Sequence, residues 1–310
     1  MSIINRSAWW FPLVSVFLLL TGCAGGPEAK QSSEYSSLYS GKSELTFSTL
    51  MPINSAEEGV MRGDKAYSEG KLDLAMFEYI RALEIDPDNA DTFYKVGAIN
   101  MEKKSMKKAE SAFRLSLERN PEHSGALEGM GLLLLQRRDY KQAREMLQLA
   151  TKYNLRRWKS FNALGILADL RHDFVTARYN YDTALRLSPR NAMIHTNLGY
   201  SHYLAGDWFK AESQYRAALN ANPKHERAWR NLGQLYTRRG RYEEAIDVFT
   251  NAMEEADAYN TMGYICMSDG KYERAESFFQ KAATTSPSYH VAANENLVKV
   301  RRLKRQKRSR

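Results

Sequence analysis

Residues Gly199–Pro223, GYSHYLAGDWFKAESQYRAALNANP, carry the pattern that decides the fold of this chain. An alanine, Ala211, stands twelve residues after the first glycine, and the aromatic Tyr215 stands four residues beyond that alanine. The stretch closes on a proline. The same spacing occurs elsewhere in the chain, so the stretch is one unit of an internal repeat, and periods of this length are typical of helical arrays.

Seven units share the pattern, and most of them close on a proline. The glycines are Gly63, Gly97, Gly131, Gly165, Gly199, Gly233 and Gly263. The alanines are Ala75, Ala109, Ala143, Ala177, Ala211, Ala245 and Ala275. The large residues are Tyr79, Phe113, Leu147, Tyr181, Tyr215, Phe249 and Phe279. Successive glycines are 34 residues apart except for the last step, which is 30 residues, so we expect the second helix of the short sixth unit to run nearly straight into the last unit.

Apolar residues within a unit fall at helical intervals in two runs. In the sixth unit the first run holds Trp229 and Tyr236, and the second holds Ala245 and Phe249. The pair Arg239-Gly240 separates the runs and is typical of a tight turn between antiparallel helices. Glycine and alanine remove side-chain bulk where the two helices approach each other, and a closing proline cannot continue a helix. One helix pair cannot bury its apolar stripe alone, so the units must stack.

This unit resembles the tetratricopeptide repeat over residues 56–289. The residues that carry the resemblance best are Trp229, Leu232, Gly233, Tyr236, Ala245 and Phe249. The resemblance implies an all-α, right-handed solenoid of about seven helix-turn-helix repeats, followed by a C-terminal cap helix and basic tail over residues 290–310. The third unit departs from the pattern at its close, where Leu155 replaces the proline. Such repeats are protein-binding scaffolds, so the fold by itself specifies no activity.

The amino terminus predicts export and lipidation. Residues 1–22 combine one charge, Arg6, with a short apolar run, as in a secretory signal peptide. Leu20-Thr21-Gly22-Cys23 resembles the lipobox of bacterial lipoproteins, which implies cleavage before Cys23 and diacylation of its thiol; the alternative is an ordinary signal with a coincidental cysteine. Ala24 follows in place of the aspartate that retains enteric lipoproteins in the inner membrane. The resemblance therefore implies a lipid anchor in the outer membrane, with the repeats facing the periplasm.

Residues 23–55 predict a lipidated flexible tether, because the segment is rich in serine and has little aliphatic pattern. As a coil it would reach roughly 30 Å on average. The alternative is that Tyr35, Tyr39 and Phe47 pack on the first repeat or on a partner.

The net charge of +9, from 45 basic and 36 acidic residues, is unevenly distributed. Arg6 leaves with the signal peptide, and eight further basic residues lie in positions 299–310, so 45 − 9 = 36 basic residues balance the 36 acidic ones in the repeat body. This balance argues against a nucleic-acid binder. The basic tail favours contact with anionic lipid or an acidic protein, and the alternative is a tail that is merely solvated.

We find no set of residues with the spacing of a catalytic, cofactor or metal site, and we therefore expect a protein that is not an enzyme. His195 and His202 lie seven residues apart on one helix face but have no third ligand beside them, and His202 occupies a packing position. Cys266 also occupies a packing position and is expected to be a buried, inert thiol.

In tetratricopeptide domains, places 2, 5, 9, 12 and 13 of the first helix line a concave groove, and the resemblance transfers this role to matching positions here. They are Leu132, Leu135, Lys159, Asn162, Ile166, Asp169, Leu170, Met193, Thr196, Tyr200, Tyr203, Leu204, Arg227, Arg230, Gln234, Thr237 and Arg238. Among them we select six as partner-binding residues: Asn162, Tyr200, Tyr203, Arg227, Arg230 and Arg238. Tyrosine and arginine contribute much of the energy of interfaces, so we expect an extended peptide or a carboxylate there. The alternative is a solvated basic helix face.

The lipobox, the array after a serine-rich tether, and the last unit, YNTMGYICMSDGKYERAESFFQKAATTSPSYHVAANENL (259–297), together resemble the TadD-type lipoproteins of tight-adherence (Flp) pilus systems. The resemblance implies a scaffold that captures secretin or another pilus-assembly protein. Two alternatives stay open: a pilotin of the type IV pilus, and an envelope adaptor for peptidoglycan hydrolases or proteases.

Overall fold

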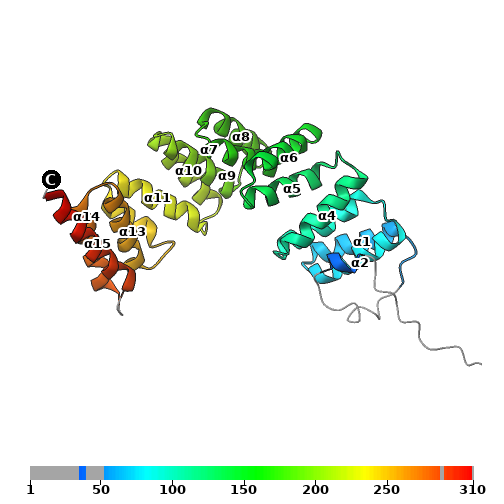
Figure 1. The fold of residues 1–310 in the computed structure, drawn as a ribbon, viewed down its shortest axis with the longest axis horizontal. Helices are drawn as coiled ribbons and strands as arrows, with labels where there is room; N and C mark the ends of the chain where they lie inside the picture. The colour runs from blue at the N-terminus through cyan, green and yellow to red at the C-terminus, as the bar shows by residue number, and fades with distance from the viewer. Residues whose placement is uncertain (1–34, 40–51, 287–289, 309–310) are drawn as a thin grey trace, which may run out of the picture. The chain divides into compact units, whose positions relative to one another are not determined.

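A computed structural model of the chain describes residues 35–39, 52–286 and 290–308, and every regular element in these ranges is helical (Figure 1). The first helices of the seven pairs are α1 Ala56–Ser68, α3 Ala90–Glu102, α5 Ser124–Gln136, α7 Trp158–Asp169, α9 Ala192–Leu204, α11 Glu226–Arg238 and α13 Glu255–Ser268. The second helices are α2 Leu72–Ile85, α4 Met106–Arg119, α6 Tyr140–Tyr153, α8 Phe174–Leu187, α10 Trp208–Ala221, α12 Tyr242–Phe249 and α14 Tyr272–Thr285. A short 3-10 helix, η1 Ser36–Leu38, precedes the pairs, and α15 Val291–Arg308 follows them. The predicted all-α repeat fold is confirmed.

The turn inside each unit closes with a residue in the left-handed region. Four units use glycine there, at Gly70, Gly206, Gly240 and Gly270, with φ between 72° and 81°. The second, third and fourth units instead use Lys104, Arg138 and His172, with φ of 59°, 65° and 59°. The helix that follows is often capped by an aspartate, as where Asp207 Oδ1 accepts a 3.2 Å hydrogen bond from the backbone N–H of Lys210.

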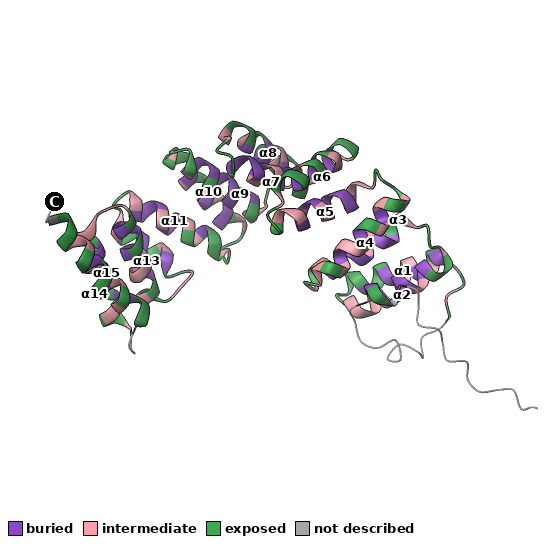
Figure 2. Ribbon diagram, in the orientation of Figure 1, coloured by how far each residue is buried: buried purple, intermediate pink, exposed green. Residues whose placement is uncertain are grey.

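Each repeat glycine lets the two helices of its pair approach closely, as the sequence predicts. A Cβ atom at Gly199 would stand 2.7 Å from the Tyr215 ring, and one at Gly97 would stand 2.5 Å from the Phe113 ring. No real side chain tolerates such contacts, so only glycine fits. The large residue of every second helix is thereby buried, and Figure 2 shows buried residues along the sides where neighbouring helices meet.

The loops between units are held by a side chain as well as by the closing proline. Asn120 Oδ1 accepts a 3.0 Å hydrogen bond from the backbone N–H two residues on, and Asn222 does the same. Asn154 keeps this turn, with a 2.8 Å bond from the backbone N–H of Arg156. The asparagine turn explains why Leu155 replaces the proline without disturbing the loop.

The sixth unit differs from the sequence expectation. Its second helix, α12, ends at Phe249 after 8 residues, whereas the other second helices have 14. The chain then turns, with the backbone N–H groups of Ala252 and Met253 donating to the Phe249 carbonyl, before α13 begins at Glu255. The expectation that α12 runs nearly straight into the last unit is therefore wrong. The four missing residues shorten the helix instead of merging two helices.

Residues 35–39, which we expected within a flexible tether, pack on the second unit. Tyr35 and Leu38 are buried, and the Tyr35 ring meets the Phe93 ring edge-on with centroids 5.3 Å apart. Asn100 Nδ2 donates a 3.0 Å hydrogen bond to the Leu38 carbonyl, and Lys108 Nζ donates to the Tyr39 carbonyl. These five residues therefore pack on the array, as the alternative to a tether expected, but these contacts are with the second unit and not with the first. The signal peptide, Cys23 and Phe47 lie outside the described residues.

Helix α15 covers the open end of the array, as the cap-helix prediction requires. Ala293, Leu297 and Val300 are buried on this helix, which packs against α14 and α13. Part of the predicted basic tail belongs to α15, where Arg301 and Lys304 both bind the Glu276 carboxylate at 2.9 Å. Within the described ranges, no helix combines the length and apolar character needed to cross a bilayer.

Candidate partner-binding face

The first helices of successive units contact one another in order, so their outward sides form one continuous surface, which we call the first-helix face. The contacts run α3 to α5, α5 to α7, α7 to α9, α9 to α11 and α11 to α13. The groove positions predicted from the sequence fall on these helices. Their side chains, however, divide into exposed residues and residues buried between the helices.

Tyr200, Tyr203 and Arg238 come together on this face, as predicted. The two tyrosine rings stack with centroids 5.9 Å apart and planes inclined by 19°, and the Arg238 guanidinium lies 5.9 Å from the Tyr203 ring centroid. Gln234 Nε2 donates a 3.2 Å hydrogen bond to the Tyr203 hydroxyl. Arg238 also binds Asp269 of the next unit at 2.8 Å. Burial raises the pKa of Tyr203, so this hydroxyl stays protonated near neutral pH.

Arg227 and Arg230 do not join that cluster through any contact of the described residues. Both lie exposed in the first turns of α11, and Arg230 forms an exposed ion pair with Glu226 at 3.0 Å. Exposed pairs of this kind contribute little to stability. These arginines are therefore accessible from solvent, but they are not preorganised.

Asn162 does not occupy the place expected of it. The side chain is 5% exposed, and its Oδ1 accepts a 2.9 Å hydrogen bond from Asn197 Nδ2. Thr196 and Thr237 are also buried. Asn162, Thr196 and Thr237 lie between neighbouring helices, so Asn162 is a helix-to-helix contact and not a residue that a partner can reach.

Asp169 is a second internal contact at a predicted groove place. One carboxylate oxygen accepts a 2.7 Å hydrogen bond from Ser201 Oγ of the next unit, and the other accepts a 2.8 Å bond from the Tyr181 hydroxyl. Burial raises the pKa of Asp169, and the two hydrogen bonds oppose that rise. The residue links α7, α8 and α9 rather than facing a ligand.

A pocket of about 490 Å³ opens on the first-helix face between the first four units. It is lined by Tyr67, Tyr94, Ala98, Met101, Glu102, Phe113, Gly125, Glu128, Gly129, Leu132 and Lys159. Leu132 and Lys159 are groove positions predicted from the sequence, and the other nine lining residues are not. The signal was present, because Tyr67, Tyr94 and Glu102 occupy the same groove places of the first and second units.

Two glycines of α5 keep this pocket open. A Cβ atom at Gly125 would lie 2.8 Å from the Tyr94 ring, and one at Gly129 would lie 2.4 Å from the Phe113 ring. The aromatic floor therefore depends on the absence of side chains at these two positions. An apolar or aromatic side chain of a partner fits a floor of this kind.

Acidic groups stand at both sides of the floor. The buried Glu128 carboxylate accepts hydrogen bonds of 3.1 Å from the Ser160 N–H and 2.8 Å from Ser160 Oγ, and Arg157 Nη1 stands 3.7 Å away. The Tyr67 hydroxyl donates a 3.2 Å bond to Glu102, which is exposed. The Glu128 carboxylate thus has its hydrogen-bond partners within the protein. Glu102 and Lys159 are the exposed charged residues of the pocket lining.

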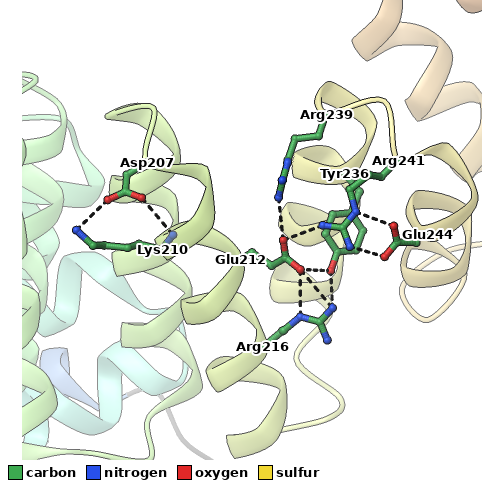
Figure 3. A network of polar contacts seen from close by, with 8 residues as sticks. All are labelled: Asp207, Lys210, Glu212, Arg216, Tyr236, Arg239, Arg241 and Glu244. Atoms are coloured by element: carbon green, nitrogen blue, oxygen red, sulfur yellow. Dashed lines mark hydrogen bonds and ion pairs between the residues drawn. The ribbon is translucent and has the colours of Figure 1, made fainter.

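A second cavity, of about 380 Å³, lies beside the shortened helix α12. Its lining comprises Arg216, Leu219, Asn220, Trp229, Leu232, Tyr236, Glu244, Asp247 and Val248. One wall belongs to a polar network centred on Glu212, which binds Tyr236, Arg239 and Arg241 at 2.8, 3.0 and 2.8 Å (Figure 3). The network joins α10 to the sixth unit and does not close the cavity.

The described residues hold no group of three His, Cys, Asp or Glu side chains that could bind a metal ion. His202 is buried, and burial lowers its pKa. Cys266 is 1% exposed, and burial raises the pKa of its thiol, as expected for a packing residue.

Comparison with known proteins identifies the repeat. Family models described as tetratricopeptide repeat match residues 90–123, 128–192, 196–260 and 256–289, and one described as TPR repeat matches residues 63–104. No curated protein matches the chain.

Solved structures share the fold at low identity. A tetratricopeptide repeat protein from Parabacteroides merdae has a TM-score of 0.54 at 18% identity, covering 80% of this chain and 99% of that one. The APC/C hetero-tetramer Cut9-Hcn1 has a TM-score of 0.59 at 17% identity, covering 83% and 50%. Pseudomonas aeruginosa pilF has a TM-score of 0.48 at 16% identity, covering 79% and 97%. At these identities the likeness concerns the fold alone.

Proposed function

The chain belongs to the tetratricopeptide repeat family, and from this premise we propose that it is a non-enzymatic scaffold whose first-helix face holds an extended segment of a partner protein. Proteins of this fold generally act as protein-interaction scaffolds. The observation that carries the proposal is the pocket between the first four units, with its aromatic floor kept open by Gly125 and Gly129.

The two ends of the face suit different parts of one partner segment. The pocket of the first four units suits an apolar or aromatic anchor, because partner residues buried in such pockets carry most of the binding energy. The Tyr200, Tyr203 and Arg238 cluster suits a carboxylate or a polar stretch, since arginine binds carboxylates in a planar fork. A segment lying along the face would meet both.

A filled pocket tests the face directly. Ala98→Trp places a ring in the pocket, and we expect at least a tenfold loss of partner affinity because the anchor can no longer enter. Val175→Trp, at an exposed position of α8, is the matched control for the added ring. If Ala98→Trp bound normally and the pair Tyr203→Ala with Arg238→Glu did so as well, the assignment of this face would be wrong.

We further propose that the scaffold is a lipoprotein of the outer membrane that takes part in assembling a tight-adherence pilus or its secretin. The resemblance of residues 20–23 to a lipobox, Ala24 after it, and the repeat array that follows a predicted signal peptide support this role. A type IV pilotin or an adaptor for peptidoglycan hydrolases or proteases shares these features and is the alternative. Replacing Cys23 by serine should release the protein from the membrane fraction and abolish labelling by fatty acid.

Co-purification distinguishes the partners. An affinity tag is best inserted between Gly26 and Glu28, because residues 35–39 pack on the second unit and would be disturbed by an insertion. Gently solubilised envelopes should yield a secretin or pilus-assembly proteins, identified by mass spectrometry. Recovery of hydrolases or proteases would contradict the pilus role and favour the adaptor.

A further inference from the structure

Three basic residues occupy a backbone conformation that the other units reserve for glycine. Lys104, Arg138 and His172 close the turns of the second, third and fourth units with φ near 60°, and all three side chains are exposed. Residues with a Cβ atom rarely adopt this region, and Lys and Arg have no short polar group to stabilise it locally. Among the described residues, neither Lys104 nor Arg138 makes a side-chain hydrogen bond or ion pair. Side-chain contacts within the protein therefore do not explain why Lys104 and Arg138 stand at these turns.

These turns lie at the same end of three stacked units, whose first helices contact each other from α3 to α5 and from α5 to α7. Lys103 binds Asp73 of the first unit, and Arg137 binds Glu110 of the second. The exposed basic residues of the row are Lys104, Lys107, Arg138, Lys141, Arg171 and His172, and we call them the basic turn edge.

Carboxylates pair with the arginines of the corresponding turn of the sixth unit, whereas no carboxylate of the described residues pairs with a member of the basic turn edge. There, Arg239 and Arg241 both bind Glu212, and Arg241 also binds Glu244. In the row, Asp73 and Glu110 pair with Lys103 and Arg137, and Asp139 and Asp173 each accept a hydrogen bond from a backbone N–H at the start of a helix. The members of the basic turn edge are thus exposed, make no ion pair among the described residues, and can meet an external anionic partner.

The amino-terminal part of the described chain meets the protein beside this edge. Tyr39 is bound through its carbonyl by Lys108, four residues after Lys104, and η1 packs against α4. Tyr35 stands only twelve positions after Cys23, so an anchor at Cys23 could stand at most about 40 Å from Tyr35. This reach is shorter than a tether ending at residue 55 would allow.

We propose that the basic turn edge binds the anionic headgroups of the bilayer that carries the protein. The choice of a membrane over an acidic protein rests on the lipid anchor of the proposed function, while the charge of the edge is independent of it. A row of cations on a flat edge meets many headgroups at once, and each Lys or Arg near an anionic surface strengthens binding several-fold.

Vesicle binding of the unlipidated full chain tests the edge separately from the anchor. Full-length Cys23→Ser protein is mixed with vesicles of phosphatidylcholine containing phosphatidylglycerol, and with vesicles of phosphatidylcholine alone. Binding is expected only to the anionic vesicles and should weaken as salt is added. In the same background, Lys104→Gly with Arg138→Gly should reduce the partition coefficient about 30-fold.

The Lys104→Gly, Arg138→Gly variant should fold like the parent protein, so a loss of vesicle binding would not come from misfolding. Glycine is the residue that four units already use at this turn, so the variant removes two charges without straining the backbone. The matched control, Arg190→Ala with Lys224→Ala, removes the same charge from two exposed positions in loops between units and should bind like the parent protein.

Two results would overturn the proposal. Equal loss in the control pair would show that net charge matters and that the edge does not. Failure of the parent protein to bind anionic vesicles, with polyglutamate binding that the glycine pair removes, would assign the edge to an acidic protein. Either result leaves the Ala98→Trp experiment on the first-helix face unaffected.

Discussion

The Glu212 carboxylate accepts a 2.8 Å hydrogen bond from the Tyr236 hydroxyl, and this bond joins the fifth helix pair to the sixth. The same carboxylate binds Arg239 and Arg241 of the next turn (Figure 3). Since each unit of a repeat array contacts only its neighbours, such a link sets the cooperativity between them. The sequence motif holds none of this information, because Glu212 is not a repeat position.

Replacing Glu212 by glutamine should lower the free energy of unfolding by about 2 kcal/mol at pH 7, since hydrogen bonds to charged groups contribute about 1.5–3 kcal/mol. Burial alone would raise the pKa of Glu212, but the Tyr236 hydrogen bond and Arg241 outweigh it and lower the pKa. A lowered pKa stabilises the fold above the unfolded value of about 4.3 and loses that effect as the pH falls through the folded value. Urea unfolding at pH 7 and pH 3 should therefore show the difference shrinking in acid.

Glu243→Gln is the control for that experiment, because Glu243 is exposed and makes no ion pair among the described residues. A difference between wild type and Glu212→Gln that stayed constant from pH 7 to pH 3 would show that the lost contribution is not that of the ionised carboxylate.

Lys104→Gly should stabilise the protein by about 1 kcal/mol, although glycine substitutions usually destabilise. The left-handed φ of 59° at this turn is strained for lysine and free for glycine. The reverse change, Gly206→Lys in the equivalent turn of the fifth unit, should destabilise by a similar amount. Thermal unfolding of the two variants measures both; shifts of the same sign would contradict the assignment of backbone strain.

Gly199→Ala should destabilise the array by about 1–3 kcal/mol, even though alanine favours helices over glycine by about 1 kcal/mol. The new Cβ would stand 2.7 Å from the buried Tyr215 ring, which has no space to withdraw. Asn220→Ala, on the exposed side of α10, is the control and should change little. Denaturant unfolding of both proteins gives the comparison.

Leu38→Ala should lower the free energy of unfolding of the second unit by about 2–3 kcal/mol, the lower range for a buried leucine. Leu38 is 3% exposed, and its carbonyl accepts the Asn100 hydrogen bond. Hydrogen exchange should then speed up in α3 and α4, whereas Ser37→Ala, at an exposed neighbour, leaves it unchanged. Unaltered exchange in Leu38→Ala would show that residues 35–39 do not support the array.

Of the six partner-binding residues predicted from the sequence, three come together on the first-helix face and one is buried between helices. Repeat positions correctly brought Tyr200, Tyr203 and Arg238 together, because the spacing of a helix fixes which residues share a side. Spacing does not say whether a side chain at the border of that side turns outward or toward the next helix, and Asn162 turns inward to Asn197. The pocket itself was missed, because it needs two glycines on α5 beside rings from two other helices.

The sequence by itself determined the helix pairs, the contact of each repeat glycine with the large residue of its second helix, and the cap helix, because these depend on neighbours within one period. The tertiary structure decided what lies between periods: the shortened α12, the placement of residues 35–39, the pocket, and the row of basic turns. Those features arise where stacking brings together residues that are distant in the chain. The sequence pattern gives the period of the units, but it does not give the surface that the stacked units form.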